Sequence, residues 1–387
     1  MTMKIELKGI EFSNKGAELM LHAMLQQIKH YQPNADVVLT PGHLLPYKKR
    51  AVLGCWQKLS FRLCGVDWTF LGNMLPSALR RLLFHFGIVV EKEIDLVLDA
   101  SGFIYSDQWE VKRLALCHAH LKRIGRFGQD YIFMPQAFGP FERQGHAKLM
   151  KAILSKAKYV FARDKASLAA LTGLGEPANH VIQYPDMTTL LDVGDVALSV
   201  NLPTRFATIV PNSKMYQGGQ AEVKSDYERF LVAAIDKVWA LGITPVLLNH
   251  EGKKDHLLCQ NIIPKCVKAP VYINDIGALE VKKILGMAQF NLSSRFHGCV
   301  SSLSQAVPTL ATSWGHKYEQ LFTEYGCKHH IMSIKQISQL EEMLTQLSQL
   351  DEQAKSTLLR AAQQQKQQTR QMWQSLFEST TEQLKVN

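Results

Sequence analysis

Residues 291–314, NLSSRFHGCVSSLSQAVPTLATSW, hold the pattern that decides the fold. The stretch begins as a predicted strand, the small side chains of 298–306 predict a helix that packs closely on a sheet, and 307–313 predict a second strand. Arg295 and His297 follow the first strand. Because they stand two residues apart in extended chain, they point to the same side and offer a fixed positive charge beside a group that exchanges protons near neutral pH.

The same alternation of short apolar runs and amphipathic stretches extends along the chain. Strands are predicted at 3–10, 35–40, 94–100, 130–136, 158–163, 180–186, 205–212, 243–250, 270–274, 288–294 and 307–313. Runs that are apolar on both faces and separated by helices indicate parallel sheets covered on both sides. We therefore predict an α/β protein of two doubly wound, Rossmann-like domains that face a cleft.

The predicted domains have approximate boundaries. Residues 1–195 form the amino-terminal domain and 200–335 the carboxyl-terminal domain, with the turn-rich stretch 191–204 as the link. Residues 336–387, rich in Gln, predict helices that pack back over the body, with a frayed polar tail as the alternative. Residues 43–92 predict a basic and aromatic helical insertion in the first domain.

The composition limits the class of protein. Of 387 residues, 46% are apolar and 20% charged, which is a globular composition large enough for two domains. The formal net charge of +10 favours an acidic partner such as a phosphorylated substrate, an anionic membrane or a nucleic acid. The start, MTMKIELKGIEF, lacks an apolar signal region, and no later run reaches the about 18 to 20 apolar residues of a bilayer crossing. We expect a cytoplasmic protein.

The spacing of cysteine and histidine argues against a metal. Seven cysteines are scattered without a C-x-x-C pair, which is typical of reduced thiols. Cys117 and His120 in CHAH share a helix face, so a pair of metal ligands remains an alternative to an ordinary half-buried helix. We expect no metal site.

Ligands of open parallel sheets bind at the carboxyl ends of the strands. There, FSNKGAE offers Asn14 and Gly16, which form either an anion site at a helix N-terminus or only a helix cap. DASGF offers Ser101 and MPQAFGPF offers Gln136, either as substrate contacts or as parts of rigid turns. FARDKAS offers Arg163, which either grips a carboxylate or phosphate or pairs with the neighbouring aspartate.

The strongest indication of a functional site is the pair of Arg295 and His297 in SRFHG. The alternative is a satisfied core histidine beside an arginine that caps a carbonyl. Downstream, SWGHKYEQLF adds His316 and Lys317 at the next strand exit, which favours a functional cluster over that alternative.

The order of the motifs resembles that of the polysaccharide pyruvyl transferases. The motifs are NKGAELML, MPQAFGPF, FARDKASLAALTGLG, YPDMTTLL and SRFHGCVSSLSQAVPTLATSWGHKYEQLF, and the resemblance runs from about residue 10 to 327. The arginine-x-histidine segment is its most specific part. One departure is DASGF, where the family carries a glycine-rich turn and this chain has only Gly102; that departure bears on the acceptor side.

The resemblance implies a two-domain GT-B-like fold and a reaction. Family members move a pyruvyl group from phosphoenolpyruvate onto two sugar hydroxyls, giving a cyclic ketal. We expect no cofactor beyond this donor, and the sequence leaves open whether a divalent cation assists. On that basis His297 transfers the proton, and Arg295 and Arg163 bind the two anionic ends of the donor. Lys317 is a supporting cation. The sugar acceptor, of a polysaccharide or a lipid-linked oligosaccharide, faces Asn14, Ser101 and Gln136 on the first-domain side.

Residues 43–92 combine basic with aromatic and aliphatic side chains. The basic residues are Lys48, Lys49, Arg50, Lys58, Arg62, Arg80, Arg81 and Lys92. Such helices suit an anionic membrane surface, and we expect peripheral contact at the inner face of the cell membrane. The alternative is an insertion packed on its own domain.

Two rival functions remain. A GT-B-type glycosyltransferase would bind a nucleotide sugar, but no acidic residue stands clearly at the strand end expected to hold a ribose. A nucleic-acid-binding protein agrees with the net charge, yet the basic residues lack the aromatic platforms of known modules, so we expect no nucleic-acid partner. An inactive scaffold is disfavoured by the four cationic or titratable side chains at strand exits.

Overall fold

The computed structural model describes residues 2–63, 66–175, 179–216, 221–312 and 316–386. They divide into two compact units. Unit 1 comprises Met1–Phe12, Met20–Met187 and Met372–Asn387, and unit 2 comprises Ser13–Leu19 and Thr188–Gln371.

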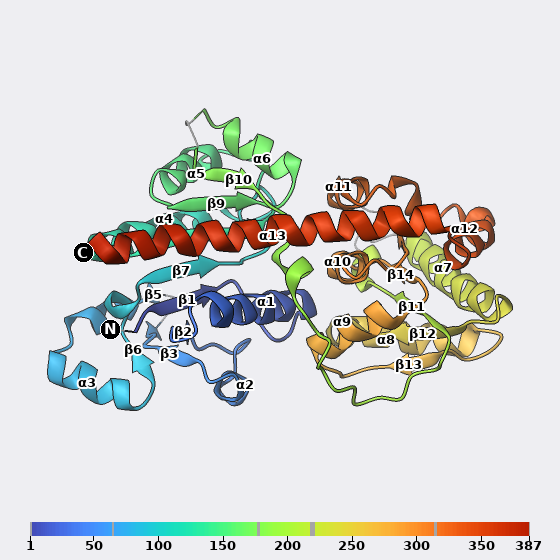
Figure 1. The fold of residues 1–387 in the computed structure, drawn as a ribbon, viewed down its shortest axis with the longest axis horizontal. Helices are drawn as coiled ribbons and strands as arrows, with labels where there is room; N and C mark the ends of the chain where they lie inside the picture. Colours follow the sequence, from blue (N-terminus) through green and yellow to red (C-terminus); the bar gives the residue numbers. More distant parts are fainter. Residues whose placement is uncertain (1, 64–65, 176–178, 217–220, 313–315, 387) are drawn as a thin grey trace. The chain divides into compact units, whose positions relative to one another are not determined.

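Unit 1 contains an eight-stranded, entirely parallel sheet in the order β10-β9-β8-β7-β1-β2-β3-β6, with helices along its faces (Figure 1). The strands are β1 (Lys4–Lys8), β2 (Asp36–Leu39), β3 (Trp56–Lys58), β6 (Ile88–Val89), β7 (Leu96–Asp99), β8 (Asp130–Gln136), β9 (Tyr159–Ala162) and β10 (Val181–Gln183), and a separate antiparallel pair is formed by β4 (Arg62–Leu63) and β5 (Val66–Asp67). The helices are α1 (Lys15–Tyr31), whose first residues are counted with unit 2, α2 (Tyr47–Val52), α3 (Ser77–His85), α4 (Val111–Ile124), α5 (His146–Leu154) and α6 (Lys165–Thr172).

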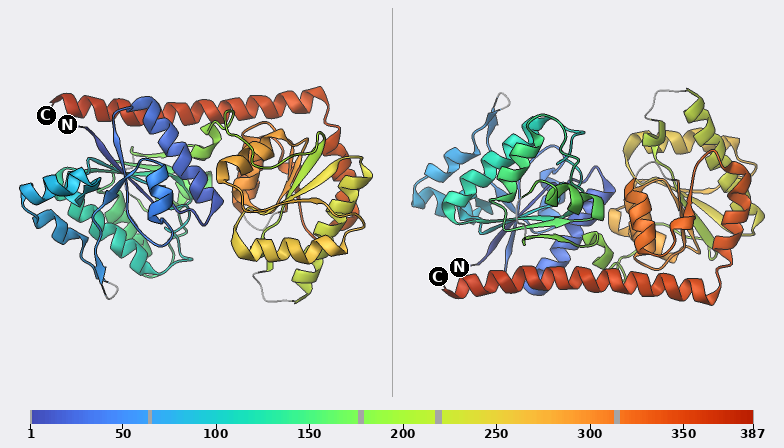
Figure 2. Two further views of the ribbon diagram at one scale, coloured as in Figure 1. Left: turned by 90° about the horizontal axis from the view of Figure 1, so that it is seen from below. Right: turned by 90° about the horizontal axis from the view of Figure 1, so that it is seen from above.

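Unit 2 contains a six-stranded parallel sheet in the order β13-β12-β11-β14-β15-β16, again with helices along its faces (Figure 2). The strands are β11 (Phe206–Val210), β12 (Thr244–Leu248), β13 (Val271–Ile273), β14 (Asn291–Ser293), β15 (Thr309–Thr312) and β16 (Ile331–Met332). The helices are α7 (Ala221–Ala240), α8 (Gly252–Ile262), α9 (Ala278–Met287), α10 (Phe296–Leu303), α11 (His316–Glu324), α12 (Leu340–Ser348) and α13 (Glu352–Val386).

Short 3-10 helices occupy several connections. They are η1 (Thr69–Met74), η2 (Glu91–Glu93), η3 (Gly125–Phe127), η4 (Met187–Leu190), η5 (Ser213–Tyr216), η6 (Ile263–Lys265), η7 (Lys328–His330) and η8 (Ile337–Gln339).

Central strands are buried along nearly their whole length. All five residues of β11 and the last six of β8 are buried, because helices cover both faces of each parallel sheet. The predicted fold of two doubly wound α/β domains followed by carboxyl-terminal helices is therefore confirmed.

The structure departs from the expected domain boundaries. The chain enters unit 2 at Thr188, before the expected link, and Ser13–Leu19 also belong to unit 2. Residues 43–92 are not a purely helical insertion, since β3 and β6 form the last two strands of the unit 1 sheet. These strands are three and two residues long, too short for a periodic signal.

The carboxyl-terminal helices contribute buried side chains to both units. Leu340, Leu344 and Leu347 of α12 are buried in the core of unit 2. In α13, the side chains of Met372, Trp373, Leu376 and Phe377 in unit 1 are almost fully buried.

Among the described residues, no helix combines the length and apolar character needed to cross a membrane.

Candidate functional site

The candidate site lies where the strand order reverses in unit 2. From β11 the chain adds β12 and β13 on one side, and β14, β15 and β16 on the other, so β11 and β14 are neighbours. In such sheets ligands bind beside the carboxyl ends of the two strands at this switch point. Residues 211–214 follow β11 and 294–297 follow β14, so Arg295 and His297 stand at this point.

Arg295 is buried and holds two carboxylate partners. Its Nε donates to Oδ2 of Asp255 across 3.0 Å, its Nη2 donates to the same oxygen, and its Nη1 donates to Oε2 of Glu251. The other carboxylate oxygen of Asp255 accepts the backbone N–H of Ser213 at 2.9 Å. Burial lowers the pKa of Arg295 to about 10, so the guanidinium remains charged at neutral pH. The side chain is thereby fixed between the loop after β14 and the start of α8.

Buried hydroxyl groups fix the backbone just before Arg295. Oγ of Ser294 accepts a hydrogen bond from the Tyr227 hydroxyl at 2.6 Å and also bonds the Thr312 hydroxyl. The Ser294 carbonyl accepts hydrogen bonds from Nδ2 of Asn212 and the Tyr318 hydroxyl, both at 2.9 Å. All of these residues are buried, so the turn from β14 into α10 is held from α7, β15, α11 and the loop after β11.

A hollow of about 540 Å³ opens beside Arg295, within the size range of small-molecule sites. It is lined by Ser13, Ser213, Lys214, Glu251, Gly252, Lys253, Lys254, Leu257 and Arg295. Four of these side chains are cationic and one is a carboxylate. Lys253 and Lys254 are exposed in the first turn of α8, where the helix dipole also favours negative charge. The hollow is therefore suited to an anion.

His297 is half-buried in the first turn of α10 and packs on the start of α1. A Cβ atom added to Gly16 would lie 2.2 Å from Nδ1 of His297, so only glycine leaves room for the ring. Asn14 caps α1, since its Oδ1 accepts the N–H groups of Gly16 at 2.9 Å and Ala17 at 3.3 Å. Its Nδ2 donates to Oε1 of Glu251 at 3.3 Å.

Asn14 and Gly16 thus lie in unit 2, contrary to their expected place on the first-domain side. The N–H group of Gly16 is used by the cap, which corrects the expectation that it approaches an anion. Gly16 instead lies against the His297 ring, and Asn14 caps the helix that carries Gly16. Sequence could not show this, because the contact joins residues far apart in the chain.

Lys317 lies in the first turn of α11, after β15. Its Nζ is 5.4 Å from the centre of the Phe296 ring, and that ring meets His297 edge-on with centroids 5.7 Å apart. The structure therefore brings Lys317 into the neighbourhood of the arginine-x-histidine segment. Residues 313–315 of the SWGHKYEQLF motif and the side chain of His316 lie outside the description.

His250 is a titratable residue of this region that the sequence did not single out. It follows β12 and is 3% exposed, and neither ring nitrogen makes a hydrogen bond to another residue of the described ranges. Burial, and then the charges of Arg295, His297 and Lys15, hold its pKa well below the usual 6.5. The ring is therefore neutral at neutral pH and in the electrostatic field of the site.

The shifted His250 predicts a pH-dependent stability. Below about pH 6.5 the unfolded chain binds a proton at His250 that the folded chain does not, so stability falls with acidification, by up to about 1.4 kcal/mol for each pH unit. We expect His250→Asn to remove this part of the loss between about pH 7 and pH 5. Thermal melts across that range measure it, and parallel curves for the two proteins would contradict it. His120 and His330, whose pKa values are also lowered by burial, leave a residual slope of the same sign in both.

Ser101 and Gln136 surround a buried carboxylate in unit 1. Asp99, at the end of β7, accepts hydrogen bonds from the backbone N–H of Ser101 at 2.9 Å, from the Ser101 hydroxyl, and from the hydroxyls of Tyr105 at 2.6 Å and Tyr131. Gln136 is fully buried and donates to the Asp99 carbonyl at 3.0 Å. Gln136 therefore holds the turn from within, while Ser101 is half-buried with its hydroxyl oriented by Asp99.

Arg163 follows β9 in unit 1 and is buried. Its Nη1 donates to Oδ2 of Asp186 at 3.3 Å. The adjacent Asp164 instead caps α6 by accepting the N–H of Ser167 at 2.7 Å. The carboxylate partner is thus not the neighbouring aspartate, and a role of Arg163 in donor binding stays a prediction.

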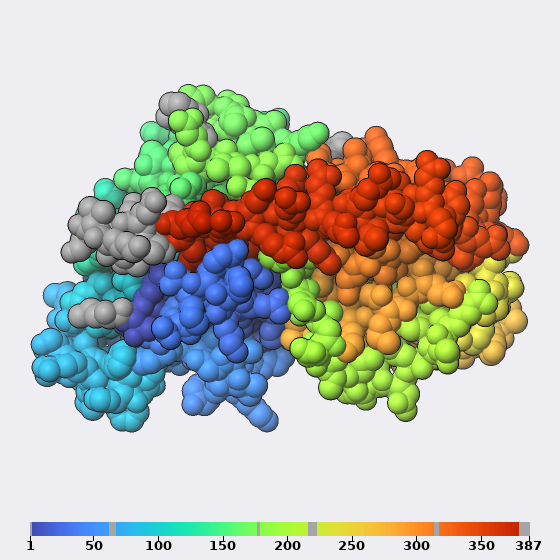
Figure 3. Space-filling model, viewed as in Figure 1, coloured from blue at the N-terminus to red at the C-terminus, as the bar shows by residue number. Residues whose placement is uncertain are grey.

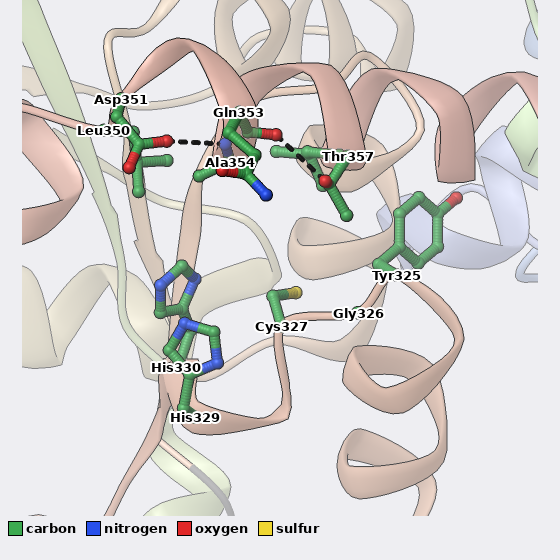
Figure 4. A pocket seen from close by; sticks show the side chains of 11 residues that line it. Tyr325, Gly326, Cys327, His329, His330, Leu350, Asp351, Gln353, Ala354 and Thr357 are labelled. Atoms are coloured by element: carbon green, nitrogen blue, oxygen red, sulfur yellow. Dashed lines mark hydrogen bonds between the residues drawn. The ribbon is translucent and has the colours of Figure 1, made fainter.

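A second hollow of unit 2, of about 280 Å³, has a different chemistry (Figure 4). It is lined by Tyr325, Gly326, Cys327, His329, His330, Leu350, Asp351, Gln353, Ala354, Thr357 and Leu358. Burial raises the pKa of Cys327 to about 12, so its thiol is protonated, and burial lowers the pKa of His330 to about 4, so that ring is neutral. Asp351 caps α13 by accepting the N–H of Ala354 at 2.7 Å. This hollow has no lysine or arginine in its lining and is less suited to an anion.

Solved structures with a similar fold share little sequence with this chain. UDP-GlcNAc 2-epimerase from Neisseria meningitidis, bound to UDP-GlcNAc, has a TM-score of 0.63 at 10% identity, covering 98% of this chain and 100% of that one. UDP-GlcNAc 2-epimerase from Methanocaldococcus jannaschii has 0.59 at 12%, covering 90% and 93%. Anabaena Alr3699/HepE in complex with UDP-glucose has 0.54 at 14%, covering 98% and 100%. The predicted GT-B-like fold class is thereby confirmed at the level of the fold.

Sequence comparison identifies the family. No match was found among curated proteins. The family model described as polysaccharide pyruvyl transferase matches residues 14–316, which include the cap of α1, the turn after β7 with Ser101, and the Arg295 and His297 segment. This chain belongs to the polysaccharide pyruvyl transferase family.

Proposed function

We propose that this enzyme transfers the pyruvyl group of phosphoenolpyruvate to two hydroxyls of a sugar residue, in a polysaccharide or a lipid-linked oligosaccharide, and forms a pyruvate ketal. The observation that carries the proposal is the cationic hollow of unit 2 beside the Arg295 and His297 segment. Family membership supports the class of reaction.

The charge of the hollow agrees with the charge of this donor. Phosphoenolpyruvate presents a phosphate and a carboxylate, which need several cations within one small volume. Lys214, Lys253 and Lys254 surround the hollow together with Arg295. Glu251 is the more exposed of the two partners of Arg295, with 22% of its side chain accessible against none for Asp255. The Glu251 carboxylate is therefore the one that a bound anion displaces from the guanidinium.

The reaction requires one proton transfer to carbon. The methylene carbon of phosphoenolpyruvate gains a proton, one sugar hydroxyl adds to the neighbouring carbon, phosphate leaves, and the second hydroxyl closes the ring; both hydroxyl protons are released. His297 is the proposed proton-transfer group because imidazole is the side chain best suited to proton transfer, and because it lies two residues from Arg295 with its ring against Gly16. No cofactor takes part in this scheme.

The acceptor contacts are proposed in unit 1. The Ser101 hydroxyl, oriented by the Asp99 carboxylate, stands at the switch point between β1 and β7, where the sugar would be held. Gln136 supports that turn. Arg163 and Lys317 are proposed to assist in binding the donor's negative charge.

A titration of phosphoenolpyruvate into the purified protein tests the donor assignment. We expect saturable binding that weakens about tenfold in the double variant Lys253→Gln/Lys254→Gln and about 100-fold in Arg295→Gln. Glu251→Gln should act in the opposite direction, with about threefold tighter binding, because one negative charge is removed while the amide oxygen can still accept the hydrogen bond from Arg295. Opposite effects of these charge changes are the mark of an anionic ligand at this hollow.

Two controls separate the donor from its rivals. Lys335→Gln removes an exposed lysine of unit 2 that lies outside the hollow, and it should leave the affinity unchanged. Uridine diphosphate is titrated in parallel, because a nucleotide-sugar glycosyltransferase is the alternative function. If uridine diphosphate binds and phosphoenolpyruvate does not, pyruvyl transfer is wrong for this chain.

A further inference from the structure

The surface of unit 1 between residues 44 and 86 is unusually apolar. Of the 21 large apolar side chains exposed in the described ranges, 12 lie in this stretch. Figure 3 shows the corresponding light blue residues on the outer surface of unit 1. Monomeric proteins rarely leave such a concentration of apolar side chains in water unless the surface binds a partner.

Helix α3 carries exposed apolar side chains along one of its faces. Leu79, Leu82 and Phe86, the last just beyond the helix end, follow one another at intervals of three and four residues and so share a face. They are 41%, 52% and 72% exposed, and none of the residues of α3 is buried. We call Leu79, Leu82 and Phe86 the α3 stripe.

The other side of α3 attaches the helix to the domain. The ring of Phe84 lies 4.5 Å from that of Trp56 in β3, and Nη1 of Arg80 donates to Oε1 of Glu93 at 2.8 Å. An ordinary surface helix turns its apolar face inward. Here charged and aromatic contacts hold the helix and the α3 stripe faces the solvent.

The exposed charged side chains of α2 and α3 are positive. Lys48 and Lys49 of α2 and Arg81 of α3 are exposed, while the carboxylates of Glu91 and Glu93 bond to Arg123 and Arg80 respectively. The exposed charge therefore attracts anions.

Not all basic residues of the segment contribute to this charge. Arg50 is buried and donates to Oε1 of Gln57, and Lys58 is buried in an ion pair with Glu6. The number of basic residues in the sequence of this segment is therefore larger than the number of exposed cations. The side chain of Arg62 lies outside the described part of the structure.

Helices α2 and α3 both contact the short strand β3. β3 and β6 are the last two strands of the sheet, Arg50 of α2 bonds Gln57 of β3, and Phe84 of α3 contacts Trp56 of β3. Figure 1 shows α3 and α2 apart from each other, with the labels of β6 and β3 between them in this view. Because both helices adjoin the same edge of the sheet, a partner with an extended surface can contact the lysines of α2 and the α3 stripe together.

We propose that the α3 stripe, with Lys48, Lys49 and Arg81, docks unit 1 on an anionic lipid bilayer. Leucine and phenylalanine enter the acyl boundary while the cations remain among the headgroups, which is the pattern of an interfacial helix. A second copy of this chain is a poorer partner, because a two-fold contact around the stripe would bring the same cations face to face. The docking itself is independent of the donor chemistry; its use, access to a lipid-linked acceptor, rests on the proposed function.

Co-sedimentation with vesicles tests the docking. Wild-type protein should bind vesicles of mixed phosphatidylglycerol and phosphatidylcholine more strongly than vesicles of phosphatidylcholine alone, and high salt should weaken the binding. The double variant Leu82→Gln/Phe86→Gln and the double variant Lys48→Gln/Arg81→Gln should each lower the partition coefficient about tenfold or more.

A matched control and a second readout keep the outcomes distinct. Leu116→Gln changes an equally exposed leucine, 58% accessible, on α4 of the same unit and should bind vesicles as the wild type does. Thermal melts show that each variant is folded. The proposal is overturned if the wild type does not bind vesicles, or if the Leu82→Gln/Phe86→Gln variant binds them equally well. It is also overturned if the wild type is a dimer in solution and the Leu82→Gln/Phe86→Gln variant is a monomer. Titration of phosphoenolpyruvate into the same proteins in solution reports on the donor site separately, so failure of the docking and failure of the proposed function are distinguishable.

Discussion

Replacing His297 by Asn lowers ketal formation about 1000-fold while phosphoenolpyruvate still binds. Asparagine keeps a polar side chain of smaller size on the support formed by Gly16, so the packing is retained. It cannot exchange a proton near neutral pH, and the methylene carbon of the donor is then not protonated. Steady-state release of phosphate in the presence of a sugar acceptor measures turnover, and calorimetric titration measures donor binding.

The control for His297→Asn is a histidine of unit 2 outside the site. His256 lies in α8, and its Nδ1 contacts the Tyr272 hydroxyl at 2.7 Å. His256→Asn should retain wild-type turnover. Near-normal turnover in His297→Asn would show that another group supplies the proton, and lost donor binding would make His297 a donor ligand instead.

Much of the fold could be predicted because buried parallel strands leave a strong pattern. β8 and β11 are continuous apolar runs, and each is followed by turn residues and an amphipathic stretch. β3 and β6 were missed because strands of three and two residues show no period, and their pairing with the sheet edge is a long-range property. The unit boundary near Thr188 could not be predicted for a similar reason, because it is defined by contacts between residues that are far apart in the sequence.

From the sequence, residues of the candidate site could be predicted only where they directly follow a recognisable strand. Arg295 and His297 could be found because they follow β14, and the strand-end rule applies to a single stretch of sequence. The carboxylate partners of Arg295 come from the start of α8, about forty residues earlier. HEGKKD after a predicted strand was the available signal for Glu251 and the two lysines of the hollow.

Gly16→Ala is the substitution whose effect depends most on the structure. Alanine normally stabilises a helix by up to about 1 kcal/mol relative to glycine, so helix propensity alone predicts a harmless change. The added Cβ would lie 2.2 Å from Nδ1 of His297, and the ring must move. Because a side chain can yield more easily than backbone, we expect a small change in the melting temperature and a loss of about 100-fold in turnover.

A double-mutant cycle shows whether the Gly16 effect acts through His297. If the methyl group acts only by displacing the ring, Gly16→Ala should cause no further loss of turnover in the His297→Asn protein. Gly277→Ala is the matched control, because Gly277 precedes α9 in the same unit and an added Cβ would meet only Oε1 of Glu280 at 3.8 Å. Additive losses would place the Gly16 effect elsewhere, and wild-type turnover in Gly16→Ala would show that the reaction tolerates a displaced His297. Non-additive loss with phosphoenolpyruvate binding intact would mean that the first turn of α1 positions the proton-transfer group.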